Sequence, residues 1–317
     1  MSEYFASLPQ RLDVFLSSQE GVLSRSKAQK LIKDGNVQVN GKSVAKVAFK
    51  LREGDHITVV ESRGSPLRGR GVESSVDLHL DILYEDDMCL VINKPAGLAV
   101  HPASSMKKGE RTLLNGIEFI FNKRSLPFSE DAALVHRLDK ATTGCLLIAK
   151  NAEVHAVLQK QFEDRTVKKT YLALVVGVPN PPSATIDAPI GRNLMQRTMM
   201  SIFKTGKSRE AKTTYKTLQA KEDCALIECD LHTGRTHQVR VHLSSIKHPI
   251  LGDPKYHSAL SEKVTKEYGI KGLCLHAWKL EFDSPVGGRR VKVVASFSST
   301  LGNALLGVGI NREAISS

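Results

Sequence analysis

Residues 135–151 read VHRLDKATTGCLLIAKN, which places one acid between two bases just before a long apolar run. Asp139 lies between Arg137 and Lys140, and two threonines and Gly144 follow. Asp, Thr and Gly are common in turns, so on composition alone this stretch predicts a turn or a cap. The same stretch also fits a reactive carboxylate, which must stay ionised and therefore needs a nearby cation.

Candidate partners for Asp139 lie both near it and far from it in the chain. Arg137 points to the same side only if LVHRLD, residues 134–139, forms a strand. The segment GRTHQVRVH supplies Arg235 and Arg240, and KKTYLALVVG supplies Tyr171, whose ring can stack on a nucleic-acid base. Spacing does not show that these residues meet, so both interpretations of Asp139 remain open at this point.

Five long motifs, taken in order, resemble those of the ribosomal large-subunit pseudouridine synthases of the RluA/RluD type. They are VINKPAGLAVHP (91–102), VHRLDKATTGCLLIAKN (135–151), KKTYLALVVG (168–177), TGRTHQVRVHL (233–243) and HPILGDPKY (248–256). The resemblance covers roughly residues 78–300, and DAPIGRN and GDPKY favour the D type over the C type. Thr143 stands where the family often has Ser, which keeps a small hydroxyl. Residues 10–60 resemble a small RNA-binding module found in a small-subunit ribosomal protein and in tyrosyl-tRNA synthetases.

The resemblance implies a reaction and a set of roles. Specific uridines of large-subunit ribosomal RNA would be isomerised to pseudouridine on a flipped-out base, with neither cofactor nor metal. Asp139 would be the catalytic carboxylate and Arg240 its salt-bridge partner. Tyr171 would stack on the target base and is also a candidate for the base that removes the ring proton. Arg137 would help to displace the target nucleotide or fill its place.

Charge and composition agree with a nucleic-acid partner. The 317-residue chain has a net charge of +12 and a pI near 9.5, which attracts polyanions. No apolar run is long enough to span a membrane, no basic amphipathic helix stands out, and the first residues do not resemble a secretory signal. The odd number of cysteines, without a CxxC pair, indicates a reduced, cytoplasmic setting. We expect a monomer.

The chain divides into three predicted parts: a small α/β RNA-binding domain at 10–62, a linker at 63–77 and a catalytic domain at 78–310. The linker is predicted from the Gly, Ser and Arg of SRGSPLRGRGVESS. In the first domain, residues 24–35 predict a helix that Ser24 caps and Gly35 ends. Its apolar stripe is Ala28, Leu31 and Ile32. Four basic residues on the rest of its surface are predicted RNA contacts: Arg25, Lys27, Lys30 and Lys33.

In the catalytic domain many short strands and few helices predict an α+β fold with a mainly antiparallel, mixed sheet. LHLDILYEDD alternates Leu78, Leu80, Ile82 and Tyr84 on one predicted face, and MCLVIN predicts an apolar strand. LVHRLD and CLLIAK are predicted strands. NAEVHAVLQKQFED and THQVRVHLSSIKHP predict helices.

Two other functions were weighed against catalysis. Histidines 232, 237, 242 and 248 suggest a metal-dependent nuclease, but separations of 5, 5 and 6 do not line one helix face. A non-catalytic ribosome-assembly factor would use the same basic surface, but it has no chemical need for the Asp, Tyr and Arg set. A member of the same family with a different rRNA or tRNA target also stays open.

Overall fold

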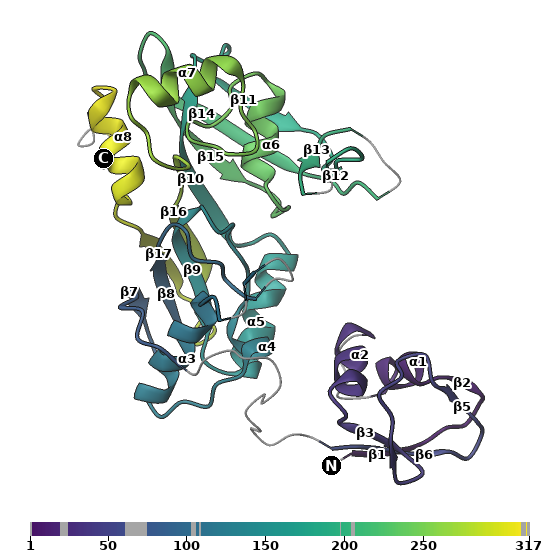
Figure 1. Cartoon of the computed structure of the whole chain (residues 1–317). Coiled ribbons are helices and arrows are strands. Elements are labelled where there is room, and N and C mark those ends of the chain that lie inside the picture. The colour runs from purple at the N-terminus through teal and green to yellow at the C-terminus, as the bar shows by residue number, and fades with distance from the viewer. Residues whose placement is uncertain are drawn as a thin grey trace. The chain divides into compact units, whose positions relative to one another are not determined.

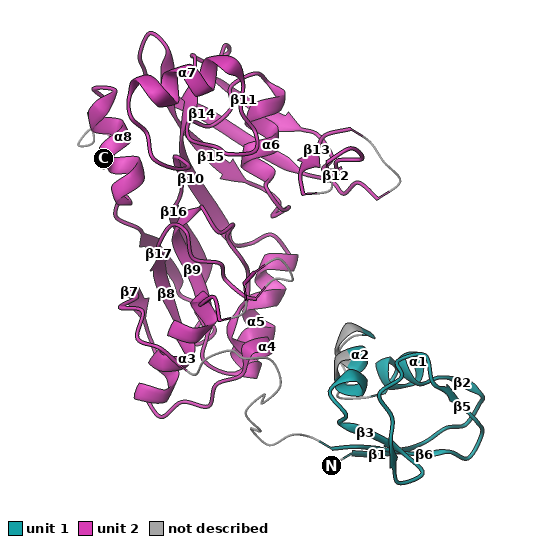
Figure 2. Cartoon of the chain, viewed as in Figure 1, with its two compact units in different colours: residues 1–70 teal, residues 71–317 magenta. Residues whose placement is uncertain are grey.

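The computed structural model describes residues 2–19, 25–60, 75–102, 106–107, 109–196, 198–203, 207–311 and 315, without the side chains of residues 26, 27 and 30. It divides into two compact units, residues 1–70 and 71–317 (Figure 2). Most of the predicted linker, including residues 63–74, lies outside the described residues, so its boundaries stay a prediction. None of the helices in the described part of the chain has the length and apolar character needed to cross a membrane.

The first unit packs two helices against small antiparallel sheets (Figure 1). Its elements are β1 (Ser2–Phe5), β2 (Gln10–Arg11), α1 (Leu12–Ser17), α2 (Arg25–Lys33), β3 (Val37–Val39), β4 (Lys42–Ser43), β5 (Lys50–Leu51) and β6 (His56–Val59). The predicted helix is confirmed as α2, which buries Ala28 and Ile32. Its predicted cap, Ser24, lies outside the described residues. Asn40 and Gly41 both have positive φ and form a tight turn between β3 and β4.

A buried carboxylate joins the two helices of the first unit. Asp13 of α1 is fully buried and accepts hydrogen bonds from Arg11, from Arg25 Nε at 2.9 Å and from Gln29 Nε2 at 3.0 Å. The hydrogen bond from Arg11 holds the pKa of Asp13 well below its usual range, against the effect of burial. Arg25 therefore has a structural partner, although half of its side chain stays exposed.

The second unit is built on one nine-stranded sheet, which agrees with the predicted α+β class. Its strands run β11-β14-β15-β10-β16-β9-β8-β7, with β17 also paired to β16, and only β9 and β16 are parallel. The strands are β7 (Asp81–Glu85), β8 (Cys89–Lys94), β9 (Thr143–Ala149), β10 (Lys168–Val176), β11 (Ser183–Asp187), β14 (Lys212–Ala220), β15 (Cys224–Leu231), β16 (Leu275–Asp283) and β17 (Arg290–Val294). A separate hairpin pairs β12 (Gly191–Arg192) with β13 (Met200–Ser201). The mainly antiparallel mixed sheet is thus confirmed.

Helices cover both halves of this sheet (Figure 1). They are α3 (Leu113–Lys123), α4 (Glu130–Ala133), α5 (Ala152–Glu163), α6 (Gln238–Ser245), α7 (Ala259–Glu267) and α8 (Ser299–Gly307). α3 packs on one face of β8 and β9, and α5 packs on the other face. This double burial explains why residues 89–92 and 145–149 are apolar at every position. α6, α7 and α8 share a second large core with β10 and β15.

Two predictions from strand periodicity are wrong. LVHRLD is not a strand: apart from one bridge between Leu134 and Ile148 it is irregular, and its apolar positions reflect loop residues that pack inward, such as Leu138. The predicted single face of LHLDILYEDD also breaks. The register of β7 shifts between Ile82 and Tyr84, so these two side chains join different cores.

Gly144 lets the two halves of the sheet approach closely. It pairs with Ala277 in the short parallel contact of β9 with β16, and its φ is +106°. A Cβ at this position would lie 2.2 Å from the carbonyl oxygen of Ala277, far inside contact distance. The glycine therefore allows the start of β9 to lie against β16, five residues after Asp139.

Gly144→Ala is expected to destabilise the protein by about 2–4 kcal/mol, because it combines backbone strain with a backbone clash. Gly269→Ala is the matched control, since Gly269 also has positive φ but a Cβ there would meet nothing within 4 Å; about 1 kcal/mol is expected for it. Denaturant unfolding of both variants measures the difference. Equal losses for the two would show that the close approach at Gly144 is not needed.

Candidate active site

Asp139 lies on the irregular segment between α4 and β9, which a buried lysine ties in place. Thr142 N–H donates to the Asp139 carbonyl at 3.1 Å and closes a turn. The Nζ of Lys94, at the end of β8, donates to the carbonyls of Pro95 and Leu98 at 2.8 Å and to that of Lys140 at 3.1 Å. Burial lowers the pKa of Lys94 to about 8, although the charge of Asp139 acts in the opposite direction. The turn predicted from Thr142 and its neighbours therefore exists, and Asp139 stands in it.

Arg240 bridges Asp139 to a second acid. From α6, its Nε and Nη2 each donate to Asp253 at 2.8 Å, and its Nη1 donates to Asp139 Oδ2 at 3.0 Å. Asp253 is buried and also accepts the backbone N–H groups of Lys255 and Tyr256. Burial lowers the pKa of Arg240, but the hydrogen bond and charge of Asp253, together with Asp139, outweigh it and raise that pKa overall. The bidentate contact fixes the guanidinium plane, so Nη1 is aimed at Asp139.

A tyrosine and a histidine form a second contact to Asp139. Met200 N–H donates to Tyr256 Oη at 2.7 Å, which leaves the hydroxyl proton to donate to His237 Nδ1 at 2.8 Å. The other ring nitrogen, Nε2, then carries its proton and lies 3.8 Å from Asp139 Oδ2. Burial lowers the pKa of His237, against the charge of Asp139. His237 also has a φ of 57°, a strained value for a residue with a side chain, just before α6.

Tyr256→Phe is expected to lower the rate constant of catalysis roughly 3- to 30-fold and the stability by about 1–3 kcal/mol, because it leaves Met200 N–H and His237 Nδ1 without a partner. Tyr215→Phe is the matched control. That buried tyrosine donates to the carbonyl of Pro181 at 3.0 Å and does not line the site. It should lose stability alone. Thermal unfolding and single-turnover rates separate the two effects, and equal activity of both variants would contradict a link between Tyr256 and Asp139.

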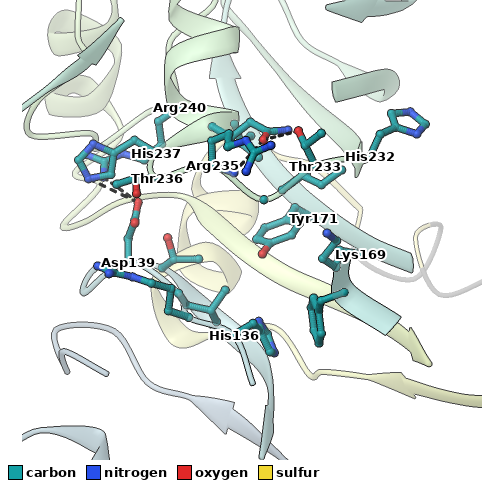
Figure 3. A pocket seen from close by; sticks show the side chains of 18 of the residues that line it. His136, Asp139, Lys169, Tyr171, His232, Thr233, Arg235, Thr236, His237 and Arg240 are labelled. Atoms are coloured by element: carbon teal, nitrogen blue, oxygen red, sulfur yellow. Dashed lines mark hydrogen bonds and ion pairs between the residues drawn. The ribbon is translucent and has the colours of Figure 1, made fainter. Parts of the chain in front are cut away.

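Asp139, Arg240 and Tyr171 line one cavity of about 710 Å³. Tyr171 comes from β10, in the middle of the sheet, and its ring lies between Asp139 and Lys169 (Figure 3). Burial, followed by the charge of Asp139, raises the pKa of Tyr171 above its ordinary value. At neutral pH its hydroxyl is therefore protonated, which favours stacking over proton removal by a phenolate.

The other predicted site residues fall into different places. Arg137 is exposed, lines the same cavity and has no hydrogen bond or ion pair to the described residues. Arg25 is paired with Asp13, as described above, and Lys33 is exposed. The side chains of Lys27 and Lys30 lie outside the described residues.

His136 serves the fold. Its Nε2 accepts the Leu147 N–H at 2.9 Å, its ring stacks on Phe162, and burial lowers its pKa to about 3.

Asp253 and Tyr256 received no role from the sequence. Both lie in HPILGDPKY, which was recognised as a motif, but no spacing rule connects this loop to α6. A buried Arg at the cavity predicts a buried acid beside it, and that expectation is the signal that could have pointed to Asp253.

The four clustered histidines have separate partners. His242 contacts Thr213 and Ala188, His232 contacts Thr214, and His248 contacts the carbonyl of Val176. Across the part of the chain that the structure describes, no three His, Cys, Asp or Glu residues are grouped to hold a metal ion. The five cysteines are buried, and burial raises their thiol pKa values, to about 12 for Cys89.

Comparison with known proteins agrees with this geometry. Residues 88–245, which include Asp139, Tyr171 and Arg240, match the model of the RNA pseudouridylate synthase family. The ribosomal large subunit pseudouridine synthase D of Nitrosomonas europaea is 39% identical over 88% of this chain and 78% of its own.

The chain belongs to the RNA pseudouridine synthase family.

Other relatives of this synthase agree. The RNA pseudouridine synthase YlyB of Bacillus subtilis is 39% identical over 90% of each chain. The solved structure of human RNA pseudouridylate synthase domain containing 4 covers 73% of this chain and 94% of its own, with 28% identity and a TM-score of 0.58. Residues 10–57 match the S4 domain. The protein is therefore an isomerase that acts on RNA, with an RNA-binding domain before its catalytic domain.

Proposed function

We propose that this synthase isomerises specific uridines of large-subunit ribosomal RNA and that Asp139 is its catalytic carboxylate. In the reaction the bond between uracil N1 and ribose C1′ breaks, the base turns, and C5 is joined to C1′. The proton on C5 is released and N1 gains one, so no external donor or acceptor is needed. A carboxylate beside the sugar can act as nucleophile or base in such a sequence.

The observation that carries this proposal is the pairing of Asp139 with Arg240 at the cavity. The 3.0 Å contact from Nη1 keeps one carboxylate oxygen oriented, and Asp253 holds the guanidinium from behind. Tyr171 lines the same cavity and offers a ring for the target base. A carboxylate that is already held in its reactive orientation favours catalysis, because it does not have to reorient before it reacts.

Base flipping follows from the shape of the site in this proposal. Asp139 lies within a lined cavity, so a uridine stacked in an RNA helix cannot bring its C1′ to the carboxylate without leaving the stack. Arg137, exposed at the same cavity, is proposed to take the place that the base leaves. Arg25 and Lys33 of α2, with Lys27 and Lys30, are proposed to contact phosphates, Arg25 with the part of its side chain that Asp13 leaves exposed.

The large-subunit target rests on the relatives. Those named ribosomal large subunit pseudouridine synthase D are 39% and 38% identical, and one named synthase C, from Vibrio parahaemolyticus, is 33% identical. We therefore favour the D type. We also propose that the protein acts as a monomer in the cytoplasm.

A map of pseudouridine in total RNA, from cells with and without this gene, tests the proposal. At least one uridine of large-subunit ribosomal RNA is expected to lose the modification when the gene is absent. A loss of pseudouridine confined to tRNA would show that the substrate is tRNA and not large-subunit ribosomal RNA. An unchanged map would leave only RNA binding and contradict the proposed function.

A further inference from the structure

The cavity has a second polar side that the chemistry at Asp139 does not use. Arg165, Lys169, Arg209 and Arg235 all line it. As seen from Asp139, Lys169 lies on the far side of Tyr171 (Figure 3). Arg235 lies above Tyr171 in the same view. A Cβ placed on Gly234 would lie 3.9 Å from Lys169 Nζ, so the loop before α6 passes directly beside this ammonium. The four cations come from three separate segments and converge on one space.

Acids do not balance this side of the cavity. Among the described lining residues, six are Lys or Arg and two are Asp or Glu. Asp139 is engaged by Arg240, and Glu163 accepts a hydrogen bond from Gln159 at 3.3 Å. Gathering like charges without counter-charges costs stability, so such a cluster indicates a ligand of opposite sign.

Lys169 shows the imbalance most clearly. It is half-buried, and its Nζ has no hydrogen-bond acceptor or carboxylate partner within the described residues, only the ring of Phe162 at 5.7 Å. Burial, with the charges of Arg165 and Arg235, lowers its pKa to about 8. An ammonium in this position is poorly solvated and repelled by its neighbours, and an anion would relieve both effects.

The nearest acid to the two arginines is poorly placed to neutralise them. Glu210 has a side chain 88% exposed, and its carboxylate is 3.9 Å from Arg165 Nη2. Arg235 uses Nε to donate to the backbone carbonyl of Glu210 at 2.9 Å, which orients its guanidinium without cancelling its charge. Arg235 is therefore positioned, and both arginines keep donors for a ligand.

We propose that Arg165, Lys169, Arg209 and Arg235 form a binding subsite for one phosphodiester group of the RNA strand, next to the nucleotide whose base stacks on Tyr171. This inference rests on the proposed function, because it takes the occupant of the cavity to be a flipped nucleotide. Lys169 and Tyr171 are two residues apart on β10, about 7 Å, which one nucleotide unit spans. A base on Tyr171 thus places a neighbouring phosphate among the cations, and the phosphate in turn fixes how the sugar meets Asp139.

Binding of small nucleotides to the full-length protein tests the subsite without any turnover. Uridine, uridine 5′-monophosphate and uridine 3′-monophosphate are titrated by calorimetry into wild type, Lys169→Met, Lys169→Arg and Lys123→Met. Met keeps the length of the side chain without its charge, Arg restores the charge, and Lys123 is an exposed lysine of α3 that does not line the cavity. Competition with inorganic phosphate distinguishes a site for free phosphate from one that needs the attached nucleoside.

One of the two monophosphates is expected to bind wild type and Lys123→Met at least about tenfold more tightly than uridine. Lys169→Met should lose this difference and Lys169→Arg should keep it. Because Lys169→Met removes an unpaired half-buried charge, its melting temperature should not fall, which excludes misfolding as the cause. Inorganic phosphate should compete only weakly.

Equal affinity for uridine and both monophosphates, including no binding by any of them, would overturn the subsite, as would a phosphate effect that survives in Lys169→Met. Binding by inorganic phosphate as tight as by the nucleotide would show an anion site unrelated to the strand, and would also overturn it. Asp139→Asn should keep the phosphate effect. An error in the role of Asp139 would therefore leave this result intact, so the two proposals fail separately.

Discussion

Asp139→Asn is expected to lower the single-turnover rate of uridine isomerisation by at least about 10⁴-fold, the scale seen when an enzyme loses the group that reacts with its substrate. The change is nearly isosteric, but the amide is neither nucleophile nor base at neutral pH. The fold should survive, because Arg240 keeps its two hydrogen bonds to Asp253. The measurement is conversion of ribosomal RNA from cells without the gene by excess purified protein.

A matched control is Asp164→Asn, which removes an exposed acid whose partner is Lys160 at 2.7 Å. It should leave the rate unchanged. RNA affinity should stay within about threefold of wild type for Asp139→Asn, since its carboxylate repels phosphate rather than binds it. Activity of Asp139→Asn within tenfold of wild type would exclude Asp139 as the catalytic group.

Arg240→Met is expected to have the second largest effect, and it should reduce both stability and activity. Without the guanidinium, the buried carboxylate of Asp253 loses two charge-assisted hydrogen bonds, which should cost about 3–5 kcal/mol. Asp139 also loses the contact that orients it, and misplacement of a reacting group by about 1 Å can cost roughly 100-fold in rate. Denaturant unfolding and single-turnover kinetics measure the two losses.

The double variant Arg240→Met with Asp253→Asn separates the loss of stability from the loss of activity. The asparagine removes the uncompensated charge but keeps Oδ1, which accepts the backbone N–H groups of Lys255 and Tyr256. Most of the stability should return, while the rate should stay low because Asp139 is still unheld. Recovery of activity together with stability would show that Arg240 acts only through folding.

Hydrophobic periodicity predicted the elements that are regular strands or helices with one or both faces buried. Residues 89–92 of MCLVIN are all apolar because helices cover both faces of β8, and α6 places Val239 and Leu243 in the core as its helical spacing predicts. LVHRLD misled for a physical reason. Its apolar residues pack inward from an irregular loop, so Leu138 is buried without any strand, and the alternation that was to align Arg137 with Asp139 does not exist.

The site itself was beyond what local sequence can predict. Asp139 and Arg240 are 101 positions apart, and they meet because β9 and β10 lie in one sheet and α6 packs on β10. Their pairing was expected from the family resemblance and not from spacing. The basic residues of α2 show the same limit, because composition gave their charge but not that Asp13 engages Arg25. Asp253 was missed since its role depends on a loop that folds back to α6.

The role of Asp139 in the cell can be measured by giving the chromosomal gene the Asp139→Asn change and mapping pseudouridine in large-subunit ribosomal RNA, with protein level checked against wild type. The same uridines should stay unmodified as in cells without the gene, although the variant protein is present and folded. A map identical to that of wild-type cells would contradict catalysis by Asp139.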